Sequence, residues 1–345
     1  AEPATVVDRM TFRSDGDGYL PTGNQQVFFV PAEGGTPRQM TSGKYPVSTS
    51  ITWMPDSESI IFASNRSDKP EYSPRQSDLY SVSLATGVLT QLTDHAGSEG
   101  NPAVSPDGRF LAYAATAGIR KGYNGAELVI KDFKTGETRT LTDTLDRSIA
   151  DIQWSDNSKR IWIGYDDLGV GRVAEVDLNG KLRKAEIVIG GTAIGRPYTS
   201  GAFSVGGDAW LAFTQGRDDR PADIAVFRPG KAPLQLTDLN SDLMGQRQMA
   251  RVERLVWPSS HDELMIEGWV MKPPGFDPSR QYPMILEIHG GPHAAYGPNY
   301  STEAQLYAAA GYVVFYTNPR GSTSYGDTFA NEIDLAYPGY DYDDL

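Results

Sequence analysis

The sequence predicts a β-propeller built from four-stranded blades, followed by the beginning of an α/β-hydrolase domain. Three observations support this prediction. The first 240 residues contain a repeat of about fifty residues, each repeat is made of strand-type segments without helical periodicity, and strands alternate with helices after residue 250. A chain of 345 residues has room for about two such domains.

The repeat is marked by a strand end of the form x-Leu-Thr. It closes the segments PRQMT, LTQLT, TRTLT and LQLT, whose last residues are Thr41, Thr93, Thr142 and Thr237, with Met in place of Leu in the first segment. The successive intervals are 52, 49 and 95 residues, so the last interval is nearly two units, and one copy near Ala185–Gly190 has lost the signature. Self-similarity at a fixed period of this length indicates an array of structural repeats.

Each repeat also contains two strand-type segments before the x-Leu-Thr end. The first of the two is IIFAS, FLAYAA, RIWIGY or AWLAFT, and the second is LYSVSL, ELVIKDF, VAEVDL or DIAVF. Glycine-containing turns such as Ala85–Gly87 follow the second segment. Four short strands per repeat are typical of a propeller blade, and we count about five blades before residue 240. The repeated Trp, Ser-Pro-Asp and Leu-Thr residues are predicted to serve packing and turns, not ligand binding.

The pattern changes after Arg251. Segments 284–288 and 312–317 are strand-type, a helix between them is predicted to begin after the N-cap Ser301, and another helix is expected near 328–335. The acids of Asp341–Leu345 suit the first turn of a further helix, so we expect the chain to stop inside its second domain. We therefore predict three parts: a partial propeller at 1–245, a linker with the first hydrolase strands at 246–280, and a truncated N-terminal part of the catalytic domain at 281–345.

Composition excludes several classes of protein. The net charge of −13 disfavours binding to nucleic acid or anionic lipid, because phosphate recognition needs fields of Lys and Arg. Cysteine is absent and the four histidines form no metal-ligand motif, so we expect neither a metal site nor a cofactor. No run approaches the roughly 20 apolar residues of a membrane helix, which predicts a soluble protein, cytoplasmic or periplasmic.

A possible oxyanion loop lies in the segment MILEIHGGPHAAYG. In α/β-hydrolases an HGG-type loop after an early strand supplies one backbone N–H to the oxyanion hole. Glycine suits this position because a side chain would obstruct the approach of the backbone to the developing anion. The candidates are Gly290 and Gly291, with His289 closing the strand. The alternative is a plain Gly-Gly turn.

The nucleophile of such a site is missing from the chain. No Gly-x-Ser-x-Gly elbow occurs, and the nearest segment, STSYG, makes Ser324 a weak candidate. In α/β-hydrolases the order is Ser, Asp or Glu, then His, all after the oxyanion loop, so His289 and His293 are not expected to be the triad base. No catalytic triad residue is therefore predicted in this chain, and we expect the triad after Leu345.

The whole chain, repeat region included, resembles the prolyl oligopeptidase family of serine peptidases, in the branch of acylaminoacyl-peptidases and dipeptidyl-aminopeptidase-like enzymes. The resemblance rests on HGGP at His289–Pro292, AAAGYVVFYTNPRGSTSYGDTFAN at Ala308–Asn331 and YPGYDYDDL at Tyr337–Leu345. It implies a seven-bladed propeller over an α/β-hydrolase domain, no cofactor, and acyl transfer through a serine. It also implies that the N–H of Gly291 helps to bind the oxyanion, and that the propeller restricts substrates to short peptides.

Several expectations remain open at this stage. Arg320 either orients its loop through carboxylate pairs or faces the substrate cavity. The chain is expected to associate with the rest of its own hydrolase domain, and a homo-oligomer is left open. Two other functions are compatible with the residues: a non-catalytic propeller module that binds peptides or proteins, with an incomplete hydrolase domain, and an esterase on the same fold.

Overall fold

The computed structural model describes residues 5–118 and 121–345. Contacts divide the chain into two compact units, one of Ala1–Ile119 with Lys131–Glu137 and one of Arg120–Ile130 with Thr138–Leu345. These units are defined by contacts between residues. Their limits do not test the domain boundaries predicted at residues 245 and 280, which stay predictions. None of the helices in the described ranges is long and apolar enough to cross a bilayer.

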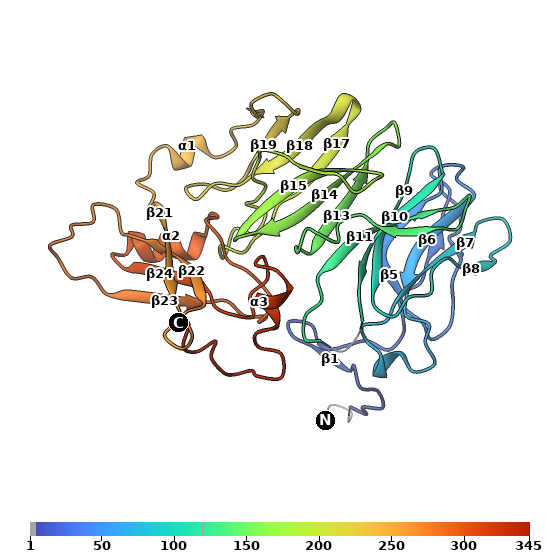
Figure 1. Ribbon diagram of the computed structural model, residues 1–345, viewed down its shortest axis with the longest axis horizontal. Helices are drawn as coiled ribbons and strands as arrows, with labels where there is room; N and C mark the ends of the chain where they lie inside the picture. The colour runs from blue at the N-terminus through green and yellow to red at the C-terminus, as the bar shows by residue number, and fades with distance from the viewer. Residues whose placement is uncertain (1–4, 119–120) are drawn as a thin grey trace. The chain divides into compact units, whose positions relative to one another are not determined.

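The regular elements of the first unit are short strands and one 3-10 helix (Figure 1). Its elements are β1 (Arg13–Ser14), β2 (Gly18–Tyr19), β3 (Phe28–Phe29), β4 (Arg38–Gln39), β5 (Val47–Trp53), β6 (Ser59–Ser64), the 3-10 helix η1 (Pro70–Tyr72), β7 (Asp78–Ser83), β8 (Leu89–Gln91), β9 (Glu99–Val104) and β10 (Phe110–Thr116). Strands β5 to β8 form one antiparallel sheet in chain order. The pairs β1–β2, β3–β4 and β9–β10 are also antiparallel.

The second unit begins with more strands of the same kind. Strand β11 (Ala126–Asp132) has residues in both units. The further elements of the second unit up to the change of pattern are β12 (Thr138–Thr140), β13 (Ile149–Trp154), β14 (Arg160–Asp167), β15 (Val170–Asp177), β16 (Leu182–Lys184), β17 (Phe203–Gly206), the 3-10 helix η2 (Gly207–Ala209), β18 (Trp210–Gln215), β19 (Asp223–Phe227) and β20 (Leu234–Gln235). Strands β13 to β16 and β17 to β20 form two antiparallel four-stranded sheets in chain order. The predicted four-stranded blade is confirmed.

The threonine of the x-Leu-Thr signature has the same hydrogen bond in four repeats. Its Oγ1 accepts the backbone N–H of the residue 13 or 14 positions earlier, at 2.8 to 2.9 Å; the four pairs are Val27 with Thr41, Leu79 with Thr93, Leu128 with Thr142, and Ile224 with Thr237. Three of these hydrogen bonds are buried, where an N–H must find an acceptor, and the one to Ile224 is exposed. The signature is therefore structural, as predicted.

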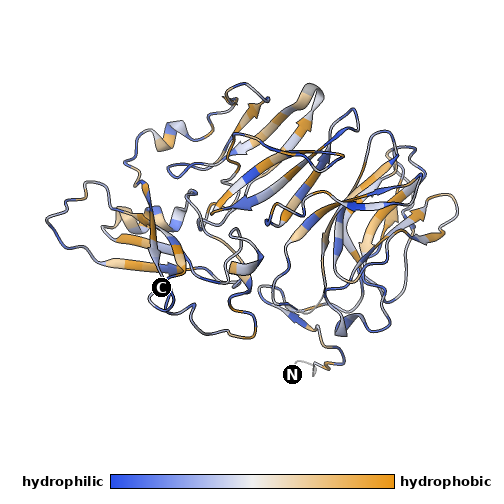
Figure 2. Cartoon of the chain, in the orientation of Figure 1, coloured by the Kyte–Doolittle hydropathy of each residue, from blue (hydrophilic) through white to orange (hydrophobic). Residues whose placement is uncertain are grey.

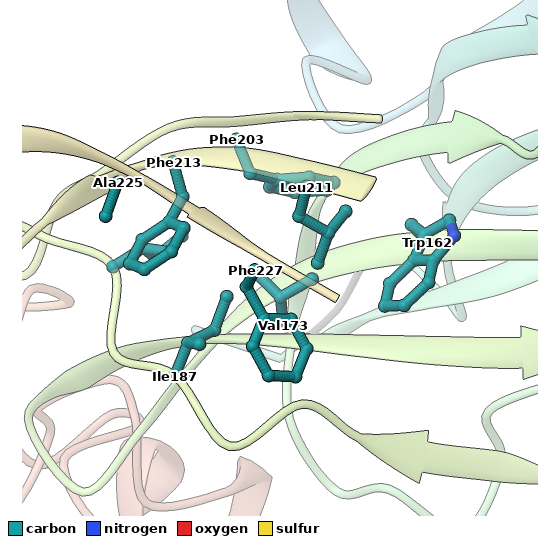
Figure 3. Packing of buried hydrophobic residues seen from close by; sticks show 9 residues of the cluster. Trp162, Val173, Ile187, Phe203, Leu211, Phe213, Ala225 and Phe227 are labelled. Atoms are coloured by element: carbon teal, nitrogen blue, oxygen red, sulfur yellow. The ribbon is translucent and has the colours of Figure 1, made fainter. Parts of the chain in front are cut away.

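The apolar side chains of successive blades pack together. Figure 2 shows hydrophobic residues concentrated on the strands, and Figure 3 shows one core cluster, which lies between the sheets β13–β16 and β17–β20. Its members are Trp162, Val173, Ile187, Ile189, Phe203, Leu211, Phe213, Ala225 and Phe227. Burying each large apolar side chain contributes about 1.5–3 kcal/mol, so stacking stabilises both blades.

The second unit ends in a mixed sheet of the order β21-β22-β24-β23. Its elements are α1 (Ser241–Met244), β21 (Val252–Pro258), β22 (Met265–Met271), β23 (Met284–Ile288), α2 (Thr302–Ala309), β24 (Val313–Asn318) and α3 (Asp327–Asn331). Strands β23 and β24 are parallel and α2 connects them, which is the predicted strand-helix-strand unit. The Oγ of Ser301 accepts the N–H of Ala304 at 3.1 Å, so the predicted N-cap is confirmed.

The last segment differs from the sequence prediction. Residues 341–345 form turns instead of the first turn of a helix, and α3 stops at Asn331, earlier than expected. Leu335 has a φ of 56°, which interrupts helical geometry, and the buried carboxylate of Asp344 is bound by Arg320. These turns are held by backbone hydrogen bonds between residues three apart, such as Asp343 N–H to the Tyr340 carbonyl, and by the ion pair of Arg320 with Asp344.

Candidate active site

Two loops meet at the carboxyl ends of the parallel strands β23 and β24. One loop begins at His289 after β23, and the other begins at Pro319 after β24. They are joined by a hydrogen bond from Thr323 N–H to the Ala294 carbonyl at 2.9 Å. In open α/β sheets, ligands bind at the carboxyl ends of parallel strands, so this is the edge at which a site is expected.

Gly291 occupies a position that suits only glycine. Its φ is 139°, and a Cβ placed there would lie 3.0 Å from the backbone nitrogen of His293. At Gly290, whose φ lies outside the left-handed region, a Cβ would meet open space. Within residues 5–118 and 121–345, the N–H groups of Gly290 and Gly291 have no hydrogen-bond acceptor. The loop therefore leaves two donors free at the end of β23.

His289 connects the two loops. Its Nε2 lies 3.0 Å from the Oγ of Ser322, and that Oγ donates a hydrogen bond to the Pro319 carbonyl at 2.6 Å. The imidazole is 7 % exposed, and burial lowers the pKa of His289 below its usual value. The neutral, buried imidazole of His289 positions the loop through its contact with Ser322. In this position it does not face a nucleophile from which it could take a proton.

His293 also holds a loop in place. Its Nδ1 donates to the carbonyl of Gly321 at 3.0 Å, and its ring lies 5.2 Å from the ring of Tyr123. The carbonyl can only accept, so Nδ1 carries the proton. Sequence reasoning missed Ser322 and Tyr123, because neither belongs to a local motif.

Arg320 is buried and bound by carboxylates. Its Nε and Nη2 donate to Asp344 at 2.9 Å, and Nη1 and Nη2 donate to Asp262 at 2.9 and 2.8 Å. The Arg320 hydrogen bond is the main reason why the pKa of Asp262 falls to about 2. These bidentate pairs connect the loop after β24 to the turn between β21 and β22 and to the last turn of the chain. These contacts fit the expectation that Arg320 orients its loop through carboxylate pairs.

Ser324 lacks the surroundings of a nucleophile. Its φ is 80°, its Oγ accepts the Gly169 N–H at 2.8 Å, and its carbonyl accepts the Leu168 N–H at 3.0 Å. No histidine forms a hydrogen bond to it within the described ranges. A serine nucleophile needs an adjacent base, so Ser324 fits a loop contact better than catalysis.

No group of three or more His, Asp or Glu side chains in the described residues is arranged to hold a metal ion. The site, as far as these residues form it, consists of backbone donors from the Gly290–Gly291 loop and a rigid second loop beside it. Free N–H groups of this kind can stabilise an anion that develops on an oxygen atom.

Comparison with known proteins gives two family matches and several relatives. Residues 18–214 match the TolB beta propeller domain, and residues 298–345 match the prolyl oligopeptidase family. An uncharacterized peptidase, YuxL, of Bacillus subtilis is 30 % identical, with 97 % of this chain and 63 % of the relative covered. Dipeptidyl-peptidase 5 of Porphyromonas gingivalis is 28 % identical, with 94 % of this chain and 46 % of the relative covered.

Solved structures show the same fold. Uncomplexed acylaminoacyl peptidase of Pyrococcus horikoshii matches with a TM-score of 0.77 and 21 % identity, over 100 % of this chain and 51 % of that structure. Puromycin hydrolase matches with a TM-score of 0.60 and 17 % identity, over 96 % and 60 %. This chain thus spans about half to three fifths of the length of the proteins it resembles. The chain belongs to the TolB beta propeller domain family, whose model matches residues 18–214, and its residues 298–345 are similar to the prolyl oligopeptidase family.

Proposed function

We propose that this chain is the propeller and the first part of the catalytic domain of a serine peptidase that hydrolyses short peptides. The observation that supports it most is the Gly291 N–H, which has no acceptor among the described residues and lies at the carboxyl end of β23. A donor in that position is what acyl transfer requires when a carbonyl oxygen becomes negative. The names of the relatives, dipeptidyl-peptidase and acylaminoacyl peptidase, point to the same substrate class.

The reaction proceeds through an acyl-enzyme. A serine Oγ attacks the scissile carbonyl carbon while a base takes the serine proton, and the carbonyl oxygen becomes an oxyanion. The Gly291 N–H donates to that oxygen, together with the N–H of the residue after the nucleophile. The base gives its proton to the leaving amine as the C–N bond breaks. Water then attacks the ester, and the serine regains its proton as the acid is released.

We place the serine, the base and the acid outside residues 1–345. Ser322 and Ser324 have their oxygens engaged in contacts between loops, and His289 and His293 hold those loops together. This chain then contributes one oxyanion donor and the propeller, which limits access to short peptides, and it associates with the remaining part of the catalytic domain.

The test is the hydrolysis of a matched amide and ester by the full-length protein. A dipeptide p-nitroanilide and the p-nitrophenyl ester of the same dipeptide carry the same acyl group. Amide hydrolysis is expected. Turnover of the ester alone would make the protein an esterase, and turnover of neither would favour a non-catalytic binding module. The 345-residue chain is the control and should hydrolyse nothing.

A further inference from the structure

A short segment before β11 is bound to helix α3, beside the candidate active site. The segment has the sequence KGYNG at Lys121–Gly125 and belongs to the same compact unit as α3. We call residues 122–125 the docking segment. Three of its backbone N–H groups each donate to a different side chain in or just after α3, which indicates a specific contact. The pairs are Gly122 with Asp334 at 2.9 Å, Tyr123 with Asn331 at 3.1 Å, and Gly125 with Asp327 at 3.0 Å.

The two glycines of the docking segment allow this close approach. A Cβ at Gly122 would lie 2.9 Å from Oδ1 of Asp334, and a Cβ at Gly125 would lie 2.6 Å from Oδ1 of Asp327. In each case this oxygen is the one that accepts the N–H of the same glycine. A side chain at either position would displace its own acceptor, so glycine serves the contact with α3.

Asn331 binds both backbone groups of Tyr123. Its Oδ1 accepts the Tyr123 N–H at 3.1 Å, and its Nδ2 donates to the Tyr123 carbonyl at 2.9 Å. The same Nδ2 donates to the Asp327 carbonyl at 2.8 Å, which fixes the Asn331 side chain on α3. An amide offers both a donor and an acceptor, whereas an ionised carboxylate of the same size can only accept. Asn331 is therefore the residue that determines where Tyr123 lies.

The ring of Tyr123 packs against the loop that carries Gly291. Its centre lies 5.2 Å from the centre of the His293 ring, and the two planes are tilted by 42°. His293 follows Gly291 by two residues, and its Nδ1 donates to the Gly321 carbonyl at 3.0 Å. A Cβ at Gly291 would lie 3.0 Å from the His293 backbone nitrogen, so the loop is tightly folded here. A shift of His293 therefore also shifts the Gly291 N–H.

We propose that Asn331 and Tyr123 are positioning residues, which hold the Gly291 N–H in the place where it binds the oxyanion. This inference rests on the proposed peptidase function and adds the docking segment to the support of its site. Tyr123 lines a cavity of about 330 Å³ together with Ser324, whereas Asn331 is not in the wall of that cavity. A substitution at Asn331 therefore acts on the site through Tyr123 and removes no contact to a substrate in the cavity.

Asn331→Asp in the full-length protein is the first test. Above about pH 6 the carboxylate still accepts the Tyr123 N–H, but it faces the Tyr123 carbonyl without a donor. We expect kcat on a dipeptide p-nitroanilide to fall about 10- to 100-fold with little change in KM, because a displaced donor weakens the transition state.

Asn157→Asp is the matched control for this substitution. It makes the same chemical change in an exposed turn, where the Asn157 Oδ1 accepts from the Lys159 N–H and from the Ser155 hydroxyl, both at 3.0 Å. A carboxylate accepts these hydrogen bonds equally well. Asn157→Asp should therefore change neither kcat nor KM.

Variants of Tyr123 test the contact with His293. Tyr123→Ala removes the ring and should lower kcat by a similar factor, whereas Tyr123→Phe keeps the ring and should retain kcat. The variant that combines Tyr123→Ala with Asn331→Asp should be no slower than the slower single variant, because both changes break one chain of contacts. Additive losses, or equal kcat in Tyr123→Ala and Tyr123→Phe, would contradict positioning through the ring.

Thermal unfolding and the kinetics of the unsubstituted protein separate the possible failures. Each kcat is measured well below the Tm of its variant, and the two Tyr123 variants decide the inference where Asn331→Asp does not fold. Unchanged kcat in Asn331→Asp, with or without a raised KM, would overturn the inference and leave the proposed function intact. An unsubstituted protein that hydrolyses no peptide substrate would refute the proposed function and this inference with it.

Discussion

The Nε2 of His289 and the Oγ of Ser322 lie 3.0 Å apart and join the loops that follow β23 and β24. A serine next to a histidine looks like a catalytic dyad, but Ser322 is 1 % and His289 7 % exposed, and the serine proton is donated to Pro319. The pair is therefore a support for the Gly290–Gly291 loop.

Replacing Ser322 tests that assignment. Ser322→Ala should leave the full-length protein able to react with a fluorophosphonate probe, because the nucleophile that we propose is another serine. It should lower thermal stability, since the buried Pro319 carbonyl and the His289 ring each lose a partner, at about 1–3 kcal/mol for a buried group left unpaired. Loss of labelling in a variant that remains folded would identify Ser322 as the nucleophile.

Gly291→Ala should reduce catalysis more than stability. An added Cβ would crowd the backbone nitrogen of His293 and move the N–H away from the oxyanion. Removing one such donor costs about 10²–10³ in kcat, and KM should change little because the bond is made in the transition state.

Gly275→Ala is the matched control for this substitution. Gly275 also has positive φ, 73°, but has open space for a Cβ. The Gly275→Ala variant should lose about 1–2 kcal/mol of stability, because alanine is strained in a left-handed backbone conformation, and it should keep its kcat. An equal fall in kcat in both variants would show that strain, and not a misplaced donor, explains the effect.

The pair of Arg320 with Asp262 should give an acid-dependent stability difference. The pKa of Asp262 is lowered to about 2 from its ordinary 3.8, mainly by the hydrogen bond from Arg320. A lowered carboxyl pKa contributes stability that is fully present above the ordinary value and is lost as pH falls through the folded value.

Thermal unfolding of Asp262→Asn and of the unsubstituted protein at several pH values checks this expectation. The difference in Tm should be constant above about pH 4 and shrink toward pH 2. A difference that stays the same down to pH 2 would mean that the charge of Asp262 does not matter.

Thr142 offers a test of the repeat signature. Thr142→Val keeps the shape of the side chain but leaves the Leu128 N–H without its acceptor, which should cost about 1–3 kcal/mol in urea unfolding. Thr142→Ser keeps the hydroxyl and should cost less, about 0.8 kcal/mol for the lost methyl group. Equal losses would mean that the hydroxyl contributes nothing.

Local features were predictable from the sequence, and distant pairings were not. The blade strands and the Ser301 cap depend on residues within about fifteen positions of one another, so pattern and turn chemistry predict them. The partners of Arg320 are 24 and 58 residues away, and Gly169 and Ser324 are 155 residues apart. Asp166 and Thr323 line one cavity although the sequence assigns them to different domains, so no sequence pattern points to it.

We propose that this chain holds an oxyanion donor for a serine outside residues 1–345. Labelling of the full-length protein with a fluorophosphonate, followed by mass-spectrometric mapping of the modified peptide, tests this most directly. The account predicts one labelled serine, after residue 345 and in a Gly-x-Ser-x-Gly segment. Labelling at Ser322 or Ser324, or of no serine at all, would contradict it.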